Sequence, residues 1–383
     1  MKFLHLSDLH LGKSLGEFDL IEDQRFLLEQ ILQLISDKEI DAVLVAGDVY
    51  DKSIPSEAAV HLLDRFINEL AKRNIRTFMI SGNHDSDERL NFGSALFEDR
   101  GIHISAKFDG TLYKRTEEDS FGPVNIWLLP FVKASQVRHF YPEETINNYE
   151  DAVRTVIQHA DINLNERNVI VAHQFVSGHG VNPKLSGSEG MGTQNVGTIE
   201  VIGSSVFDAF DYVALGHIHS PQKVGREEVR YAGSPLKYSL SEVANEKSLP
   251  VITLNEKGMI EIELVPVQPL RNLRHIKGPL KKLLENVTDP EDYIYATLTD
   301  EEMTGDVMGI VQHTYPNTVK IDYENSHTKE IAEVDLSDYT ESKSFDELIR
   351  EFYLAMYGVE ISEDEMEIML DAAKEAGVIY EAD

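Results

Sequence analysis

The sequence predicts an α/β protein with a largely parallel, helix-covered sheet, and three observations lead to that prediction. Short apolar runs alternate with amphipathic stretches through the first half of the chain, which is the pattern of strands connected by covering helices. Polar residues that suit metal binding directly follow several of those runs. Beyond about residue 265 the chain changes to a small β/α unit followed by two helical stripes. We expect the sheet to be mixed or two-layered.

Residue periodicity places the individual elements. Strands are expected at residues 3–6, 42–46, 77–80, 126–129, 169–172, 212–215, 293–298 and 318–323, where short apolar runs occur. Helices are predicted over residues 27–35 and 59–70, because apolar residues repeat there at helical spacing. Residues 178–203 are rich in glycine and serine, so they are expected to form a long loop, either functional or a surface insertion.

Length and composition limit the class of protein. A chain of 383 residues is long enough for two or three domains, and its 42% apolar content suits a globular protein. The absence of cysteine excludes disulfides and thiolate metal sites and fits a reducing cytoplasm. No apolar run is long enough to span a membrane, and His5, Ser7 and Asp8 interrupt the N-terminal one, unlike a signal peptide. We therefore expect a cytoplasmic protein.

The net charge of −32 argues at first against a nucleic-acid partner, but the charge is unevenly distributed. Residues 1–284 hold 40 acids and 30 bases, a net of −10, whereas residues 285–383 hold 27 acids and 5 bases, a net of −22. Several acids of the first part are also candidate metal ligands, whose charge a metal would offset. The global charge therefore says little about the active face.

Five short segments carry the chemistry, and most of them directly follow a predicted strand. They are Asp8-Leu9-His10, Gly47-Asp48-Val49-Tyr50-Asp51, Gly82-Asn83-His84-Asp85, His173, and Gly216-His217-Ile218-His219. Side chains at the carboxyl ends of neighbouring strands converge on one crevice. Glycine precedes a ligand in three of the segments, where tight turns and close packing favour it.

These donors suit two divalent metals. The expected ligands are Asp8, His10 and His219 for the first metal and Asn83, His173 and His217 for the second. Asp48 has two carboxylate oxygens and can bridge both. Two divalent metal ions and the carboxylates of Asp8 and Asp48 together leave the site with a net charge of roughly +2, which would attract a phosphate. Mixed imidazole and carboxylate donors favour manganese, iron or zinc over calcium.

His84 is expected to be catalytic rather than a ligand, because it follows ligand Asn83 and so lies at the mouth of the site. There it can protonate a leaving oxygen or stabilise transition-state charge. Asp85 is expected to orient its imidazole. Six histidines outside these segments, His5, His61, His103, His159, His275 and His313, are expected to be surface or core residues, and the role of His179 stays open.

Together these segments resemble the calcineurin-like metallophosphoesterase family. The opening Lys2–Gly12, Gly47–Asp51 and the run Tyr231-Ala232-Gly233-Ser234-Pro235 resemble more closely its SbcD family, the nuclease subunits of bacterial SbcCD complexes. The resemblance implies a two-layered mixed β-sandwich flanked by helices, with a small α/β capping domain and C-terminal helices. The implied limits are 1–268 for the nuclease domain, 269–339 for the capping domain and 340–383 for a helical partner-binding segment.

The resemblance also implies an activity and partners. It implies a manganese-dependent exo- and endodeoxyribonuclease in DNA repair, recombination and replication, acting on duplex ends and on single-stranded or hairpin DNA. The seven residues named above would bind two Mn²⁺ ions, and His84 would be catalytic. An SbcC-like coiled-coil ATPase would bind the C-terminal helices, with a homodimer inside a heterotetramer. Archaeal relatives often carry a histidine where this chain has Asp51, which leaves the role of that position open.

Several alternatives remain on the residues alone. A free-standing phosphatase or small-molecule phosphodiesterase needs the same metal site, and an inactive scaffold would need none of it. The segment 270–284 holds five bases and no acid, so it is either a phosphate-contacting patch or a solvated face. The apolar stripes of residues 345–356 and 366–373 either dock on a partner or pack on their own body. Capping boxes are predicted at Ser344 with Glu347 and at Ser362 with Glu365.

Overall fold

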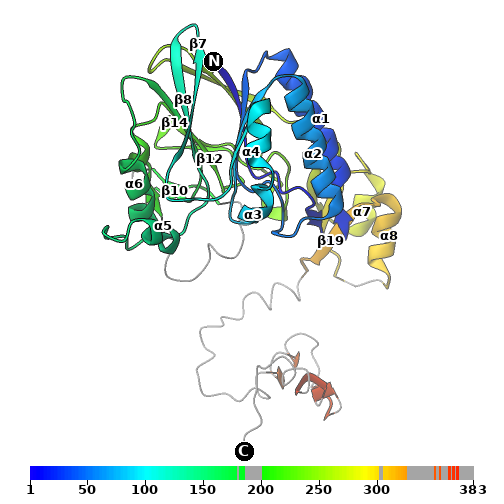
Figure 1. Ribbon diagram of the computed structural model, residues 1–383. Helices are drawn as coiled ribbons and strands as arrows, with labels where there is room; N and C mark the ends of the chain where they lie inside the picture. The colour runs from blue at the N-terminus through cyan, green and yellow to red at the C-terminus, as the bar shows by residue number, and fades with distance from the viewer. Residues whose placement is uncertain are drawn as a thin grey trace, which may run out of the picture. The chain divides into compact units, whose positions relative to one another are not determined.

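A computed structural model gives the fold of the chain (Figure 1). It describes residues 1–178, 181–185, 201–301 and 305–325, together with short pieces between residues 349 and 370. The chain divides into two compact units, Met1–Arg274 and His275–Asp383. Most of the predicted 178–203 loop, including His179, and much of the predicted C-terminal helices lie outside the described residues. None of the helices in the described part is both long and apolar enough to cross a membrane.

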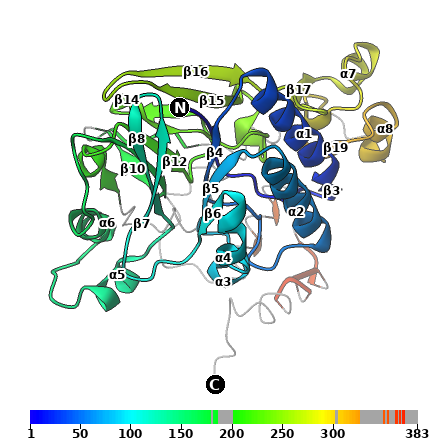
Figure 2. The ribbon, with the colours of Figure 1, turned by 45° about the horizontal axis from the view of Figure 1, so that its top comes forward.

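The first sheet of unit 1 has six strands in the order β16-β15-β1-β4-β5-β6. They are β1 (Lys2–Leu6), β4 (Ala42–Ala46), β5 (Arg76–Ile80), β6 (Ile102–Ser105), β15 (Ser248–Leu254) and β16 (Ile260–Pro266). Strands β1, β4, β5 and β6 run parallel, whereas β15 pairs antiparallel with β1 and β16 antiparallel with β15. Figure 2 shows β15 and β16 side by side beside the N-terminus. The carboxyl ends of the parallel strands therefore meet at one edge.

The second sheet repeats this plan in the order β13-β14-β12-β9-β8-β7. Its strands are β7 (Tyr113–Asp119), β8 (Gly122–Leu129), β9 (Arg167–His173), β12 (Tyr212–Gly216), β13 (Gln222–Val224) and β14 (Arg226–Tyr231). Strands β8, β9, β12 and β14 are parallel, and the outer strands β7 and β13 are antiparallel to their neighbours. Two short pairs complete the unit: β2 (Ser14–Leu15) with β3 (Phe18–Asp19), and β10 (Val176–Ser177) with β11 (Ile202–Gly203).

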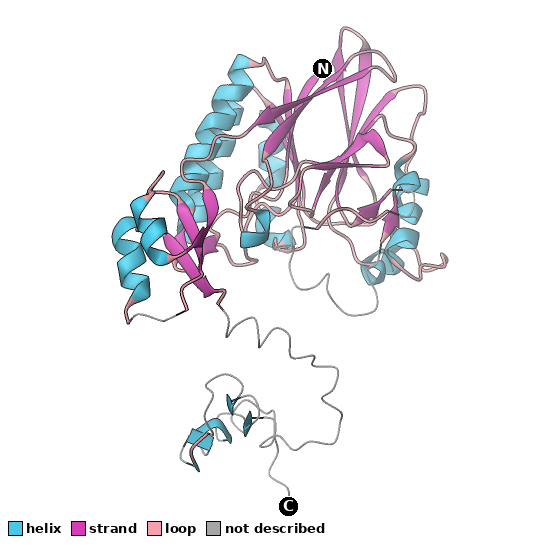
Figure 3. Ribbon diagram, turned by 180° about the vertical axis from the view of Figure 1, so that it is seen from behind, coloured by secondary structure: helices cyan, strands magenta, loops and turns pink. Residues whose placement is uncertain are grey.

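The two sheets pack face to face. Phe3 and Phe78 of the first sheet share one buried cluster with Ile126 and Tyr212 of the second. The helices α1 (Ile21–Asp37) and α2 (Glu57–Lys72) lie on one outer side, and α5 (Ala134–Phe140) and α6 (Tyr149–Gln158) on the other (Figures 1 and 3). The short helices α3 (Asp87–Leu90) and α4 (Ser94–Phe97) follow β5. The predicted two-layered mixed sandwich flanked by helices is confirmed.

Unit 2 contains a three-stranded sheet in the order β17-β18-β19. Its elements are β17 (Leu273–Gly278), which begins just before the division, α7 (Leu280–Glu285), β18 (Tyr293–Leu298), α8 (Val307–Thr314) and β19 (Thr318–Tyr323). Ile294, Leu298, Val311 and Tyr315 form its small core. The strands expected at 293–298 and 318–323 are both present.

Some C-terminal residues are also described. Ile349, Ile361 and Met366 are buried against one another. The capping box at Ser362 is confirmed, because Glu365 N donates to Ser362 Oγ (3.3 Å) and Ser362 N donates to the Glu365 carboxylate (3.0 Å). The capping box predicted at Ser344 lies outside the described residues.

Candidate metal centre

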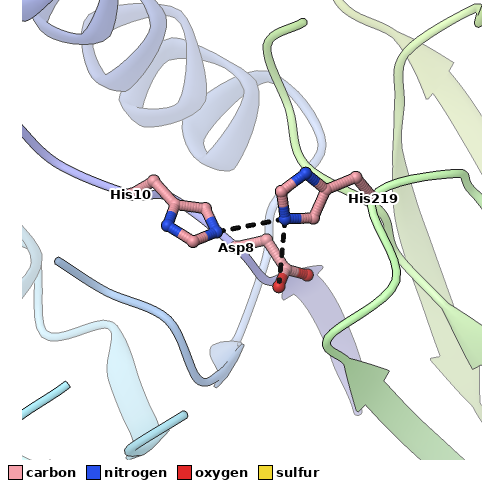
Figure 4. Close-up of side chains that lie close together, drawn as sticks. All are labelled: Asp8, His10 and His219. Carbon is pink, nitrogen blue, oxygen red and sulfur yellow. Dashed lines mark hydrogen bonds and ion pairs between the residues drawn. The ribbon is translucent and has the colours of Figure 1, made fainter. Parts of the chain in front are cut away.

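The sequence-predicted ligands come from five strand ends on both sheets. Asp8, Asp48 and Asn83 follow β1, β4 and β5 of the first sheet, while His173 ends β9 and His217 follows β12 of the second. Because both sets of strands present their carboxyl ends at the same edge of the sandwich, the side chains meet there. Figure 4 shows Asp8 and His10, on the blue segment, converging with His219, on a green loop. All of these ligands except Asn83 are buried.

The first group consists of Asp8, His10 and His219. The Nε2 atoms of His10 and His219 lie 3.1 Å apart, and His219 Nε2 is 4.0 Å from Asp8 Oδ1 (Figure 4). Their ligand atoms lie close enough together to hold one metal ion. Two imidazole nitrogens that face each other beside a carboxylate form a fitting donor set for a divalent cation.

The second group consists of Asn83, His173 and His217. Asn83 Oδ1 lies 3.1 Å from His173 Nε2 and 2.9 Å from His217 Nδ1. Asp48 lies between the two groups, because its Oδ2 is 3.6 Å from His10 Nε2 and 3.4 Å from His173 Nε2. A single carboxylate is thus shared by two adjacent clusters, and the Asp and His groups are positioned for binding divalent metals.

Burial and neighbouring charges set the protonation of these groups. Burial lowers the pKa of His217 to about 3 and that of His10 well below its usual range, so both rings keep a lone pair for coordination. Burial alone would raise the pKa of Asp48, but His173 and His10 outweigh it and hold that pKa well below its usual range. Conversely, the Asp48 carboxylate overcomes burial and raises the pKa of His173 to about 9. A metal that binds there has to displace a proton.

The backbone at the site is strained. Asp8, His10, Asp48 and His217 have φ angles of 51°, 42°, 47° and 99°, and they make up four of the seven non-glycine residues with positive φ in the described chain. Each such residue costs on the order of 1–3 kcal/mol unless its surroundings fix it. Asp8 N and His10 N donate to the carbonyl oxygens of Gly47 and Asp48 at 3.1 and 3.0 Å. These hydrogen bonds fix the β1 and β4 loops that carry the candidate ligands.

Close approach explains two of the expected glycines. A Cβ on Gly216 would lie 1.9 Å from the carbonyl oxygen of Ala46, and one on Gly82 would lie 2.1 Å from Asp48 Oδ1. Any side chain at either position would push the two sheets or the Asp48 carboxylate out of place. Glycine is required here by the packing of the ligand loops.

His84 lies beside the first group, but its neighbours differ from those expected. Its half-buried ring contacts His10 edge-on with centroids 4.9 Å apart, and its Nδ1 lies 3.1 Å from the backbone oxygen of Asp51. Asp85 instead accepts hydrogen bonds from the backbone N–H groups of Val49, Tyr50 and Gly82 at 2.9–3.1 Å. The expected orientation of His84 by Asp85 is therefore replaced by a contact with Asp51, and Asp85 joins the β4 and β5 loops.

Asp51, whose role the sequence left open, has a defined place. Its carboxylate accepts from Lys13 Nζ at 2.7 Å and lies 3.6 Å from His10 Nδ1. With His10 and His84 it forms a third set of potential ligand atoms close together. All three sets found among the described residues belong to this one centre.

Sequence reasoning missed three buried residues that support the ligands. Gln24 of α1 donates to the His10 carbonyl oxygen (2.8 Å) and accepts from Gly12 N (2.9 Å). Glu242 lies 3.4 Å from His219 Nδ1 and pairs with Lys247 at 2.5 Å. For Glu242 and Lys247 the sequence held only an indirect signal. Ser234, within the Tyr231–Pro235 run that carries the family resemblance, contacts Glu242.

The basic segment 270–284 is largely neutralised. Arg271 forms a bidentate ion pair with the buried carboxylate of Asp23, with N–O distances of 2.7 and 3.2 Å. Lys277 pairs with Glu324, and Lys281 Nζ lies 3.9 Å from Glu285. These ion pairs favour the solvated-face interpretation over a phosphate-contacting patch.

Comparisons with known proteins identify the family. Residues 1–221 match the family model for calcineurin-like phosphoesterases. The chain belongs to the calcineurin-like phosphoesterase family. Residues 269–357 match a second model, SbcD_C, described as the type 5 capsule protein repressor C-terminal domain. The two matches together support an SbcD-type metallophosphoesterase nuclease subunit.

Among solved structures, one similar to this chain is a dimetal phosphatase from Danio rerio. It is 14% identical, covers 70% of this chain and 98% of its own, and superposes with a TM-score of 0.39.

Proposed function

We propose that this phosphoesterase is a manganese-dependent DNA nuclease with two metal ions, working with an SbcC-like ATPase in DNA repair, recombination and replication. The single observation that carries the metal centre is the position of Asp48 Oδ2, within 3.6 Å of histidines from both donor groups. The match of residues 269–357 to the SbcD C-terminal model supports DNA as the substrate. The nuclease domain would comprise residues 1–268 and the capping domain 269–339.

Each side chain then has a role. Asp8, His10 and His219 would hold one metal and Asn83, His173 and His217 the other, with Asp48 between them. When bound, two divalent ions would activate a water and neutralise charge on the scissile phosphate. Both ions would sit on a protein frame that is already fixed by backbone hydrogen bonds and tight glycine turns, so little reorganisation is needed on binding.

His84 would act on the leaving oxygen. Its Nδ1–H donates to the Asp51 carbonyl oxygen, which fixes the plane of the ring. The Nε2–H then remains to protonate the leaving sugar oxygen or to stabilise charge on the phosphate. In this proposal Asp85 acts on His84 only through the loop that it holds.

The experiment that tests the function uses the full chain with Mn²⁺ on four substrates. These are linear duplex DNA, single-stranded DNA, hairpin DNA and bis-p-nitrophenyl phosphate, with His84→Ala as the matched control. We expect cleavage of DNA that requires Mn²⁺ and is slower by about 10²–10⁴-fold in the control. Hydrolysis of the small diester without cleavage of any DNA would favour a small-molecule phosphodiesterase. No hydrolysis of any substrate would favour a scaffold.

Residues 340–383 would bind the coiled-coil base of the ATPase. In support, the described part of this segment has a small apolar cluster around Ile349 and Met366, yet leaves Leu354, Ile368 and Met369 exposed. Large apolar side chains at helical spacing are the usual anchors of a helix that docks in a groove. A chain truncated at about residue 340 should keep Mn²⁺-dependent cleavage of single-stranded DNA and lose co-purification with the ATPase. Tight binding by the truncated chain would place the partner contact elsewhere.

We also propose that the chain forms a homodimer within a heterotetramer. Phe92 and Leu96, next to the metal-ligand loop after β5, are 84% and 78% exposed. Large exposed apolar side chains so close together often mark a protein interface. Multi-angle light scattering should give a dimer for the wild type and a monomer for Leu96→Glu, while a wild-type monomer would contradict the proposal.

A further inference from the structure

A buried polar cluster contacts His219 on the side away from the other candidate ligands. While its Nε2 faces Asp8 and His10, its Nδ1 lies 3.4 Å from Glu242 Oε1. Glu242, at the end of a short 3-10 turn (Leu240–Glu242), is completely buried. The imidazole thus has a carboxylate on the side opposite to the candidate metal.

The second oxygen of Glu242 is fixed as well. Glu242 Oε2 accepts from Lys247 Nζ at 2.5 Å and from Ser234 Oγ at 3.2 Å. Lys247 Nζ also donates to Ser234 Oγ at 2.8 Å and to the backbone oxygen of His219 at 2.9 Å. The cluster therefore contacts His219 twice, through its ring and through its main chain.

Stability alone does not account for this cluster. A carboxylate and an ammonium that are both buried contribute little net stability compared with packed apolar side chains, because desolvation offsets their attraction. In the second group the ring of His173 is held more simply, since His173 Nδ1 lies 2.8 Å from the backbone oxygen of Ala46. Among the described residues, carboxylates lie behind the rings of the first group alone, Glu242 at His219 and Asp51 at His10.

We propose that Glu242, neutralised by Lys247, is a positioning residue that fixes the ring of His219 with Nε2 toward the first metal position and strengthens its binding of the cation. A carboxylate that accepts the outer N–H of a ligand histidine selects the tautomer and raises the basicity of the ligand nitrogen. Loss of such a partner typically weakens metal binding by about 10–100-fold. The inference rests on the proposed function, because it assumes that His219 is a metal ligand.

The test is a calorimetric titration of the metal-free full chain with Mn²⁺ alone. Glu242→Gln keeps the size of the side chain and removes its charge. We expect two Mn²⁺ per wild-type chain, and in the variant one site weakened by about 10–100-fold. Glu246→Gln is the matched control, because Glu246 is exposed and lies in the same segment, and it should titrate like the wild type.

A purely structural role is separated by two further measurements. Glu242→Gln leaves Lys247 buried without its carboxylate, so the double variant Glu242→Gln/Lys247→Met restores neutrality if the single variant unfolds on a thermal melt. In whichever variant folds, DNA cleavage should need about 10–100-fold more Mn²⁺ for half-maximal rate, with the rate largely recovered at saturating Mn²⁺. A structural defect would lower the active fraction without moving the half-saturating concentration.

The outcomes are distinct. Two equal sites in the wild type and unchanged affinity in a folded variant would overturn the positioning role and leave the proposed function standing. A wild type that binds no Mn²⁺ would overturn the metal centre, and the positioning role with it. A selective loss at one site supports both.

Discussion

The two ends of strand β9 bury polar groups for opposite purposes. At its carboxyl end His173 and the other candidate ligands converge with their coordinating atoms toward one another. At its amino end Arg167, which is 2% exposed, is paired with Asp119 at 2.5 and 3.0 Å and donates to several carbonyl oxygens, among them that of Asn255 at 2.8 Å. The carboxyl end leaves donor atoms available to a ligand, whereas at the amino end every nitrogen of the Arg167 guanidinium donates a hydrogen bond within the protein.

The comparison teaches how buried charge can be assigned to function or to stability. The ligand end also carries positive φ angles at Asp8, His10, Asp48 and His217, whereas no positive φ occurs at Arg167 or Asp119. Strain and convergent donors together indicate a binding site, while a closed network on relaxed backbone indicates a structural tie. We therefore expect substitutions at the two ends to separate activity from stability.

The largest effect is expected from Asp48→Asn at the ligand end. Asparagine keeps the shape and tolerates a positive φ, so the fold should survive. Both metal positions lose a charged ligand, so cleavage should fall by more than the ~10²–10³-fold typical of losing one stabilising contact. Metal content by mass spectrometry and cleavage rates on one preparation measure this. Retention of two metals with wild-type cleavage would refute the bridging role.

The next effect is expected from His84→Ala. In the proposed site Asn83 supplies the ligand from this turn, so both metals should remain while cleavage slows by about 10²–10⁴-fold, the usual contribution of general acid–base catalysis. The thermal midpoint should stay close to that of the wild type, since His84 is only half-buried. Loss of a metal from this variant would make His84 a ligand instead of a catalyst.

At the amino end, Arg167→Met should reduce stability without touching the site. Removing one partner of a buried ion pair costs about 3–5 kcal/mol, and the partial exposure of Asp119 lowers that to about 2–4 kcal/mol. Urea unfolding measures the loss, and Mn²⁺ titration well below the transition should be unchanged. An altered Mn²⁺ affinity in the folded variant would show that the two ends of β9 are coupled.

A smaller loss of stability is expected from Asp85→Asn. Asp85 lies at the ligand end of the sheets but makes structural hydrogen bonds. Asparagine offers one acceptor oxygen where the carboxylate serves three backbone N–H groups, so about 1–3 kcal/mol of stability should be lost. If Asp85 acts only by holding its loops, cleavage by the folded variant should fall less than in His84→Ala. An equal fall in cleavage would return Asp85 to the catalytic machinery.

The sequence was sufficient to predict those parts of the structure that a local residue pattern determines. Apolar runs located the strands at 42–46 and 212–215, and the polar residues that follow them are brought together as expected. It was insufficient where contacts link residues far apart in the chain. The partner of the His84 ring is a backbone oxygen of Asp51, which has no side-chain signature. Glu242 lies in a polar turn that resembles any loop, and only the folded chain brings it to His219.

The smallest effect is expected on the pH dependence of the stability that Arg167 contributes. Burial would raise the pKa of Asp119, but its hydrogen bonds to Arg167 and to the Met1 ammonium prevail and lower that pKa well below its usual range. Such a group adds stability that is present above its unfolded pKa, roughly 3.9, and that is lost as the pH falls from there toward the lowered folded value. The stability gap between wild type and Arg167→Met should therefore be narrower at pH 3.5 than at pH 7, by about 0.5–1 kcal/mol. Urea unfolding at both pH values measures the gap.

The control is Lys72→Met, which removes an exposed lysine paired with Glu69. Its stability should differ from that of the wild type by no more than about 0.5 kcal/mol at either pH. A gap that stays constant from pH 7 to pH 3.5 would mean that Arg167 does not contribute to the lowered pKa of Asp119 and stabilises the amino end of β9 through its carbonyl contacts alone.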